Sequence, residues 1–197
     1  DLIIRTTALT IKGLDKADAE FMIEVPFDMN FIPLKKVKDM MVEYKIYPIK
    51  LYTDEVAAEP VLIFTTAPFV PVATDIHDVR RWSAEAPYRY VLTATLKNKK
   101  GKVLDVRNTY FGFRTVEIKD TPANEDEYGL AGRYFYVNGK PVKLKGVNRH
   151  ETNSSVGHAI TREQMHEEVM LMKRGNINHV RLSHYSNDPY WYYLADK

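Results

Sequence analysis

The segment VKLKGVNRHET, residues 142–152, places four polar side chains directly after a strand-like alternation of apolar and polar residues. The four are Asn148, Arg149, His150 and Glu151. Imidazole, guanidinium, amide and carboxylate groups can bind sugar hydroxyls, acids or metal ions. The segment therefore fits the rim of an active site, but it also fits a crowded polar loop.

The segment INHVRLSHY, residues 177–185, ends in a similar way. Arg181 lies just before the end of the apolar stretch, and Ser183 and His184 follow it. In parallel α/β sheets and barrels, ligands bind at the carboxyl ends of neighbouring strands. If both segments are such strands, their imidazole and guanidinium groups converge on one spot. From the residues alone, His150 and His184 fit equally well as loop residues satisfied by the backbone.

The elements that must position these residues begin after a long all-β region. Six segments are rich in β-branched and aromatic residues, at 1–11, 20–25, 41–52, 61–66, 88–96 and 102–118. Six or seven strands over about a hundred residues are typical of an immunoglobulin-like β-sandwich, which we predict for residues 1–118. The chain has no Cys, so aromatic residues must fill the core. Trp82 and Tyr90 are the candidates.

The sequence pattern changes after residue 118. Residues 119–133 are charged and turn-forming, which predicts a linker or insertion. Residues 134–144 read as a hairpin with a type I′ turn at Asn138 and Gly139. From there to residue 197 the pattern is strand, helix, strand, helix, which is typical of βα units in a parallel sheet.

Both helices of this pattern have clear boundary signals. Thr161 and Gln164 form a capping box for the first helix, and Gly175 supplies its stop. An apolar stripe, made of Met165, Val169 and Met172, predicts the buried face of this helix. The second helix has Pro189 at its first position, with Asn187 or Asp188 as the cap.

The composition is that of an ordinary globular protein, with 197 residues, 45% hydrophobic, 27% charged and a net charge of +2. So balanced a charge gives no reason to expect a nucleic-acid or membrane partner. No apolar run approaches the roughly 18 residues of a membrane span. Without Cys there is no disulfide framework, thiolate nucleophile or cysteine metal site. The compartment stays open between cytoplasmic and periplasmic.

The remaining histidines define no recognisable site, and neither do other known motifs. His158, His166 and His179 fit no metal-ligand spacing, and His166 falls on the charged side of its helix. His77 is expected in a loop of the sandwich. No G-x-S-x-G nucleophile elbow is present in the sequence, so a serine hydrolase is not expected. The sequence also has no glycine-rich phosphate loop.

Several motifs resemble glycoside hydrolase family 2. They are NGKPVKLKGVNRHE (138–151) and MLMKRGNINHVRLSHYSNDPYWYYLADK (170–197), preceded by RWSAEAPYRY (81–90) and FGFRTVEI (111–118). Residues 1–80 match only in their strand pattern. Arg149 favours the β-galactosidases within that family, because β-glucuronidases tend to have Lys there. Ser186 departs from the family, which usually has Pro at that position.

The resemblance implies a domain order. Residues 1–118 would be the immunoglobulin-like domain, and residues 134–197 would be the first two βα units of a truncated (β/α)8 catalytic barrel. The chain opens on Asp1 directly in strand-like sequence, as an excised piece of a longer protein would. The parent would also contain an upstream β domain of the sugar-binding type. The resemblance is compatible with a parent that forms a homo-oligomer.

The resemblance also implies a reaction: retaining hydrolysis of terminal β-galactosides by two glutamates that both lie outside this segment. The fragment alone is therefore predicted to be inactive. It needs no cofactor, whereas the parent would use a divalent cation such as magnesium with ligands outside the segment. Two alternatives are a non-catalytic β-sandwich that binds carbohydrate or a partner, and a β-glucuronidase.

The site residues carried over by the resemblance fall into three roles. His150 and His184 would bind the sugar and stabilise the transition state, and Arg181 would orient the nucleophile. Asn148 and Arg149 would bind substrate, although packing at the strand end suits both equally well. Glu151 would support these residues without a catalytic role of its own.

Overall fold

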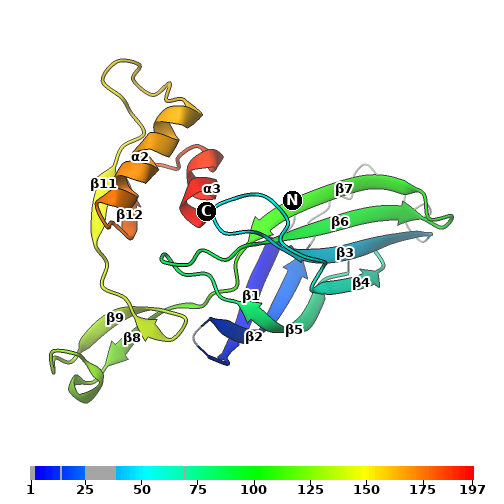
Figure 1. Cartoon of the computed structure of the whole chain (residues 1–197), viewed down its shortest axis with the longest axis horizontal. Coiled ribbons are helices and arrows are strands. Elements are labelled where there is room, and N and C mark those ends of the chain that lie inside the picture. The colour runs from blue at the N-terminus through cyan, green and yellow to red at the C-terminus, as the bar shows by residue number, and fades with distance from the viewer. Residues whose placement is uncertain (1–2, 14, 25–38, 69) are drawn as a thin grey trace. The chain divides into compact units, whose positions relative to one another are not determined.

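The computed structural model describes residues 3–13, 15–24, 39–68 and 70–197 (Figure 1). The chain forms two compact units, Asp1–Thr115 and Val116–Lys197. The division lies close to the predicted boundary at residue 118.

The first unit is a sandwich of two antiparallel sheets. One sheet has the order β1-β2-β5 and the other β4-β3-β6-β7 (Figure 1). The strands are β1 (Ile3–Ile11), β2 (Lys16–Glu24), β3 (Met40–Pro48), β4 (Leu62–Thr66), β5 (Val72–Arg80), β6 (Tyr90–Asn98) and β7 (Val103–Phe111). The seven strands found among the described residues, divided between two sheets, are the arrangement expected of an immunoglobulin-like domain.

The strand β5 was not predicted, and its position corrects the expectation for His77. Its sequence VATDIHDVR carries three charged residues besides the histidine, which hid the alternation of buried Ile76 and Val79 with exposed neighbours. The strand pairs with β2 along most of its length. His77 therefore lies in a strand and not in a loop. Val25, at the end of another predicted strand, lies outside the described residues.

The long strand predicted at 102–118 is two strands in the structure. β7 ends at Phe111, and β8 (Val116–Thr121) belongs to the second unit. Between them Phe113 is fully buried. A Cβ added to Gly112 would lie 2.8 Å from the Cβ of Trp82, so only glycine fits there. The chain turns here because Phe113 enters the core.

The core of the sandwich draws aromatic residues from both sheets, as predicted, but only one of the two candidates belongs to it. Tyr90 is buried beside Phe113, with ring centroids 5.0 Å apart in a T-shaped contact. Phe21 and Tyr44 complete the aromatic set. Trp82 is only half-buried and lies under the guanidinium of Arg114, 4.4 Å from its ring centroid. Pairing with a cation at the surface explains why this ring stays out of the core.

The second unit begins with a hairpin. β8 pairs antiparallel with β9 (Gly132–Val137), and β9 pairs with the short β10 (Lys140–Pro141). Both ends of the segment predicted as a linker are therefore in strands, and a short 3-10 helix, Ala123–Glu125, lies between them. Asn138 and Gly139 have φ of 52° and 73°, which confirms the type I′ turn.

The rest of the unit contains β11 (Gly146–Arg149), α2 (Arg162–Arg174), β12 (His179–Leu182) and α3 (Pro189–Asp196). β11 and β12 are parallel neighbours, with Val147 opposite Val180. The capping box of Thr161 and Gln164 is present, and Asp188, rather than Asn187, caps α3. Both helices are too short to cross a membrane, and the described residues contain no longer apolar helix.

The observed end of α2 differs from the predicted one in one detail. Gly175 follows the helix with a φ of −78°, a value that any residue adopts. The left-handed position is the next residue, Asn176, with a φ of 55°. Asparagine tolerates this conformation better than other residues with a side chain, so the helix reverses there and not at the glycine.

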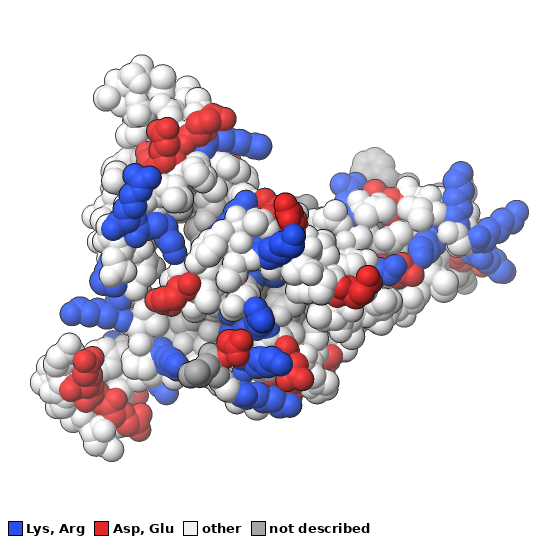
Figure 2. Space-filling model, viewed as in Figure 1, with Lys and Arg blue, Asp and Glu red and all other residues white. Residues whose placement is uncertain are grey.

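The two helices cover one face of the parallel strand pair. Met165, Trp191 and Leu194 are buried, and Val169, Met172, Val180 and Leu182 pack against them. The predicted apolar stripe of α2 is therefore confirmed as the buried face. Gly146, Asn148, His179 and Arg181 point to the other face and are exposed. On the side of the molecule in Figure 2, basic and acidic residues are interspersed, in keeping with the small net charge.

Candidate active site

The parallel pair of β11 and β12 brings the two histidine segments together. His150 follows β11 and His184 follows β12, and both side chains are exposed. Their ring centroids lie 5.4 Å apart with the planes at 82°, an edge-to-face contact. This contact arises because parallel strands in register end at the same edge of a sheet.

Arg181 joins this pair through the side chains that follow it. Its Nη1 donates to the Ser183 hydroxyl at 3.0 Å, and its Nη2 lies 3.2 Å from His184 Nδ1. A guanidinium can only donate, so His184 Nδ1 must accept. A neutral His184 ring then carries its proton on Nε2, which leaves an N–H donor for a ligand. The Ser183–His184 peptide bond is cis.

Asn148 lies on the same face as Arg181. The two residues are register partners on β11 and β12, and both are exposed. An amide and a guanidinium therefore stand side by side on the face opposite the helices. Together with the two imidazoles they form a set of hydrogen-bond donors at one edge, suited to hydroxyl or carboxylate oxygens.

Arg149 points the other way. It alternates with Asn148 along β11 and enters the helix-covered face, where its side chain is only 3% exposed. The guanidinium lies 3.7 Å from the ring centroid of Trp191 and is bonded to carboxylates on both sides. The structure therefore does not bring Arg149 to the exposed donor set.

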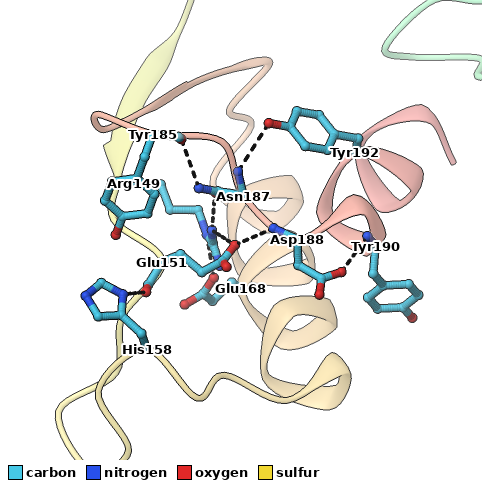
Figure 3. A network of polar contacts seen from close by, with 9 residues as sticks. All are labelled: Arg149, Glu151, His158, Glu168, Tyr185, Asn187, Asp188, Tyr190 and Tyr192. Carbon is cyan, nitrogen blue, oxygen red and sulfur yellow. Dashed lines mark hydrogen bonds and ion pairs between the residues drawn. The ribbon is translucent and has the colours of Figure 1, made fainter.

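Glu151 lies beside Arg149 in the same polar network (Figure 3). Its Oε2 is 3.4 Å from Arg149 Nη1 and accepts the backbone N–H of Asp188 at 2.9 Å. Its backbone carbonyl accepts from His158 Nδ1 at 2.6 Å, and the His158 ring meets Tyr185 edge to face. This carboxylate connects the loop after β11 to the start of α3.

Three residues of this network were not singled out as site residues from the sequence. Glu168 on α2 accepts a hydrogen bond from Arg149 Nε at 2.8 Å, and Asn187 accepts one from Arg149 Nη1. The ring of Trp191 lies under the guanidinium. One signal was available for Glu168. It falls within the helix face defined by Met165 and Met172, where a carboxylate needs a buried cation.

The described residues provide no metal site, since nowhere among them do three His, Asp or Glu side chains gather around one point. The carboxylates of Glu151 and Glu168 are both engaged by Arg149. What the exposed edge can do is donate hydrogen bonds through His150, His184, Arg181 and Asn148. Such donors orient a polyhydroxyl ligand and stabilise charge that develops on its oxygens.

An antiparallel sandwich precedes a parallel βα unit with donors at the carboxyl edge, as in enzymes that join a β domain to an α/β catalytic domain. Residues 4–114 match the family model "Glycosyl hydrolases family 2", and residues 129–197 match "Glycosyl hydrolases family 2, TIM barrel domain". The chain belongs to glycosyl hydrolase family 2 and contains its sandwich domain and the start of its TIM barrel domain. The predicted family is confirmed.

Individual relatives agree with this assignment. The chain is 44% identical over 129 residues to a β-galactosidase of Priestia megaterium, and 38% identical over 123 residues to one of Alteromonas mediterranea. These matches cover 65% and 62% of this chain but only 11% of each relative. A Bifidobacterium dentium β-glucuronidase structure superimposes with a TM-score of 0.79 at 24% identity, over 100% of this chain and 28% of that one. At this identity the likeness shows the fold alone.

Proposed function

We propose that this chain is a segment of a retaining glycoside hydrolase that acts on terminal β-galactosides. The observation that carries the proposal is the contact of His150 with His184 at the shared carboxyl edge of β11 and β12. In barrels of this kind that edge is where substrate binds. β11-α2 and β12-α3 would then be the first two βα units of the catalytic barrel.

Each exposed donor has a role in this proposal. His150 and His184 bind sugar hydroxyls, and their hydrogen bonds strengthen as the ring approaches an oxocarbenium-like state. The proton on His184 Nε2, oriented by the bond from Arg181 to Nδ1, is the donor for that step. Asn148 lines the same edge. Arg181 also holds the carboxylate nucleophile in its ionised form and in place.

The chemical step itself needs two further groups. Retaining hydrolysis uses an acid/base carboxyl and a nucleophilic carboxylate, about 5–5.5 Å apart on the two sides of the scissile bond. We assign both to the part of the enzyme outside this segment, and likewise the ligands of any divalent cation such as magnesium. The chain by itself would then be inactive.

The choice of β-galactosides rests on the curated relatives, which are named β-galactosidases. The alternative is a β-glucuronide, since the superimposed B. dentium enzyme is a β-glucuronidase. A neutral galactoside needs only hydroxyl partners, which the imidazoles and the amide supply. A glucuronide would need a cation for its own carboxylate. Arg149 is held by Glu151 and Glu168, and Arg181 is assigned to the nucleophile in this proposal.

The test compares the full-length protein with the isolated chain on chromogenic β-galactoside and β-glucuronide. We expect the full-length protein to hydrolyse the galactoside with retention of the anomeric configuration, and the isolated chain to hydrolyse neither. A preference for the glucuronide would replace the substrate. Turnover by the isolated chain, lost on mutating one of its own carboxylates, would overturn the assignment of the catalytic groups.

A further inference from the structure

Arg149 is a buried cation at the end of β11, one residue before His150. Its side chain is 3% exposed and stacks on Trp191 at 3.7 Å. A buried charge is tolerated only where it is paired and hydrogen-bonded. The contacts of this guanidinium reach both helices and the loops that follow His150 and His184.

The guanidinium ties β11 to α2 and to the loop between β12 and α3 (Figure 3), and it stacks on Trp191 of α3. Nε donates to Glu168 Oε2 on α2 at 2.8 Å. Nη1 donates to Asn187 Oδ1 in the loop after His184, and lies 3.4 Å from Glu151 Oε2. The backbone adds a further tie, since Ser183 N–H donates to the Arg149 carbonyl at 2.8 Å.

The bond to Asn187 fixes the direction of the amide. Because Arg149 can only donate, the oxygen of Asn187 faces it, and the amide nitrogen is left to donate to the Tyr185 carbonyl at 3.4 Å. Asn187 N–H also donates to the Tyr192 hydroxyl at 3.2 Å. The loop that carries His184 and Tyr185 is therefore held from Arg149 through Asn187.

The carboxylate of Glu151 connects the loop that carries His150 to the start of α3. Glu151 follows His150 and bonds the backbone N–H of Asp188, the cap of α3. One cation thus lies between two carboxylates and an amide that together span both loops. Without it, Glu151 and Glu168 would be two like charges with no cation between them, and they would repel one another.

We propose that Arg149 is a positioning residue, which sets the separation of His150 and His184 and thereby the fit of the site to the transition state. The proposal rests on the proposed function for its effect on catalysis, but not for its effect on structure. The planar fork of arginine suits it to this place. A lysine ammonium is a single point donor that cannot span Glu168 and Asn187 while lying flat on Trp191.

The experiment uses the full-length enzyme with Arg149→Lys and, as a milder change, Glu168→Gln, which keeps the size of the side chain and an acceptor oxygen. Arg162→Lys is the matched control, because Arg162 also lies over an aromatic ring, that of Tyr190 at 5.0 Å, but is exposed. The measurements are kcat and KM per folded molecule, inhibition by a cationic iminosugar, and crystal structures of the variants.

For Arg149→Lys we expect kcat to fall between about tenfold and a hundredfold, as a misplacement of about 1 Å does. KM should change far less, and the iminosugar should weaken in proportion to kcat/KM. Glu168→Gln should show a smaller loss of the same kind, and Arg162→Lys none. If Arg149→Lys lowers the melting temperature while the folded enzyme keeps its kcat, the residue is merely structural and the proposal fails.

The crystal structures separate this proposal from the proposed function. In Arg149→Lys, or in Glu168→Gln if the lysine variant does not fold, the His150 and His184 rings should lose their edge-to-face contact whether or not the enzyme cleaves glycosides. Rings that stay 5.4 Å apart, as in the wild type, would overturn the positioning role. A wild-type enzyme with no glycosidase activity would instead overturn the proposed function.

Discussion

The imidazole of His150 meets the imidazole of His184 edge to face at 5.4 Å, although the two residues follow different strands and a helix separates them in the chain. The contact depends on β11 and β12 being parallel and in register, so that both end at one edge. Arg181 then holds His184 from the same strand pair.

The end of α2 should depend on Asn176 and not on Gly175. A Cβ at Gly175 would meet nothing closer than 3.5 Å, and its φ of −78° is ordinary. We expect Gly175→Ala to be neutral or to raise the free energy of unfolding by up to about 1 kcal/mol. Asn176→Val should lower it by about 1–2 kcal/mol, because a left-handed conformation is strained for that side chain.

Urea unfolding of the full chain, followed by far-ultraviolet circular dichroism, measures both variants. The opposite order of stability would mean that the glycine ends the helix after all.

The sandwich should lose stability in alkaline solution through two buried tyrosines. Burial raises the pKa of Tyr44, and it raises the pKa of Tyr90 despite the Arg80 N–H that donates to its hydroxyl. The folded state thus prefers the neutral phenol. Its contribution is complete below the unfolded pKa of about 10 and is lost as the pH rises through the folded pKa.

The free energy of unfolding, measured from pH 8 to pH 11.5, should therefore fall less steeply in a Tyr44→Phe, Tyr90→Phe double variant than in the wild type. The difference between the two curves removes the effect of lysine titration, which both proteins share. Parallel curves would show that neither phenol resists ionisation.

Limited proteolysis should cut first in the exposed segment between β8 and β9. Residues 122–131 are almost entirely exposed, whereas β8 and β9 are paired along their length. Backbone without a partner strand opens most easily to a protease. Mass spectrometry of the first fragments locates the cut, and early cleavage within β6, whose first residues are buried, would contradict this description.

Much of the second unit was predictable because its signals are local. Three such signals are present in the structure: the capping box, the Asn138–Gly139 turn and the stripe of Met165, Val169 and Met172. Each depends only on residues that are close together in the sequence. The strand β5 was missed because charged residues interrupt its apolar alternation.

The placement of Arg149 needed the structure. Strand alternation alone puts Asn148 on one face and Arg149 on the other, but it does not tell which face the helices cover. The partners of the guanidinium come from α2 and from the loop before α3, far away in sequence. A buried ion network assembled from distant segments leaves no local pattern beyond one carboxylate in an apolar helix face.

The most direct test of the central claim is His184→Ala in the full-length enzyme, with kcat and melting temperature measured on the same preparation. His166→Ala is the matched control, since His166 is an exposed histidine on α2. Loss of a hydrogen bond that strengthens in the transition state costs about 2–4 kcal/mol, by analogy with oxyanion-hole deletions. We therefore expect kcat and kcat/KM to fall roughly a hundredfold or more with little change in melting temperature, and the control to behave as wild type. A variant that melts several degrees lower, while its folded fraction keeps the wild-type kcat, would remove His184 from the active site and contradict the account.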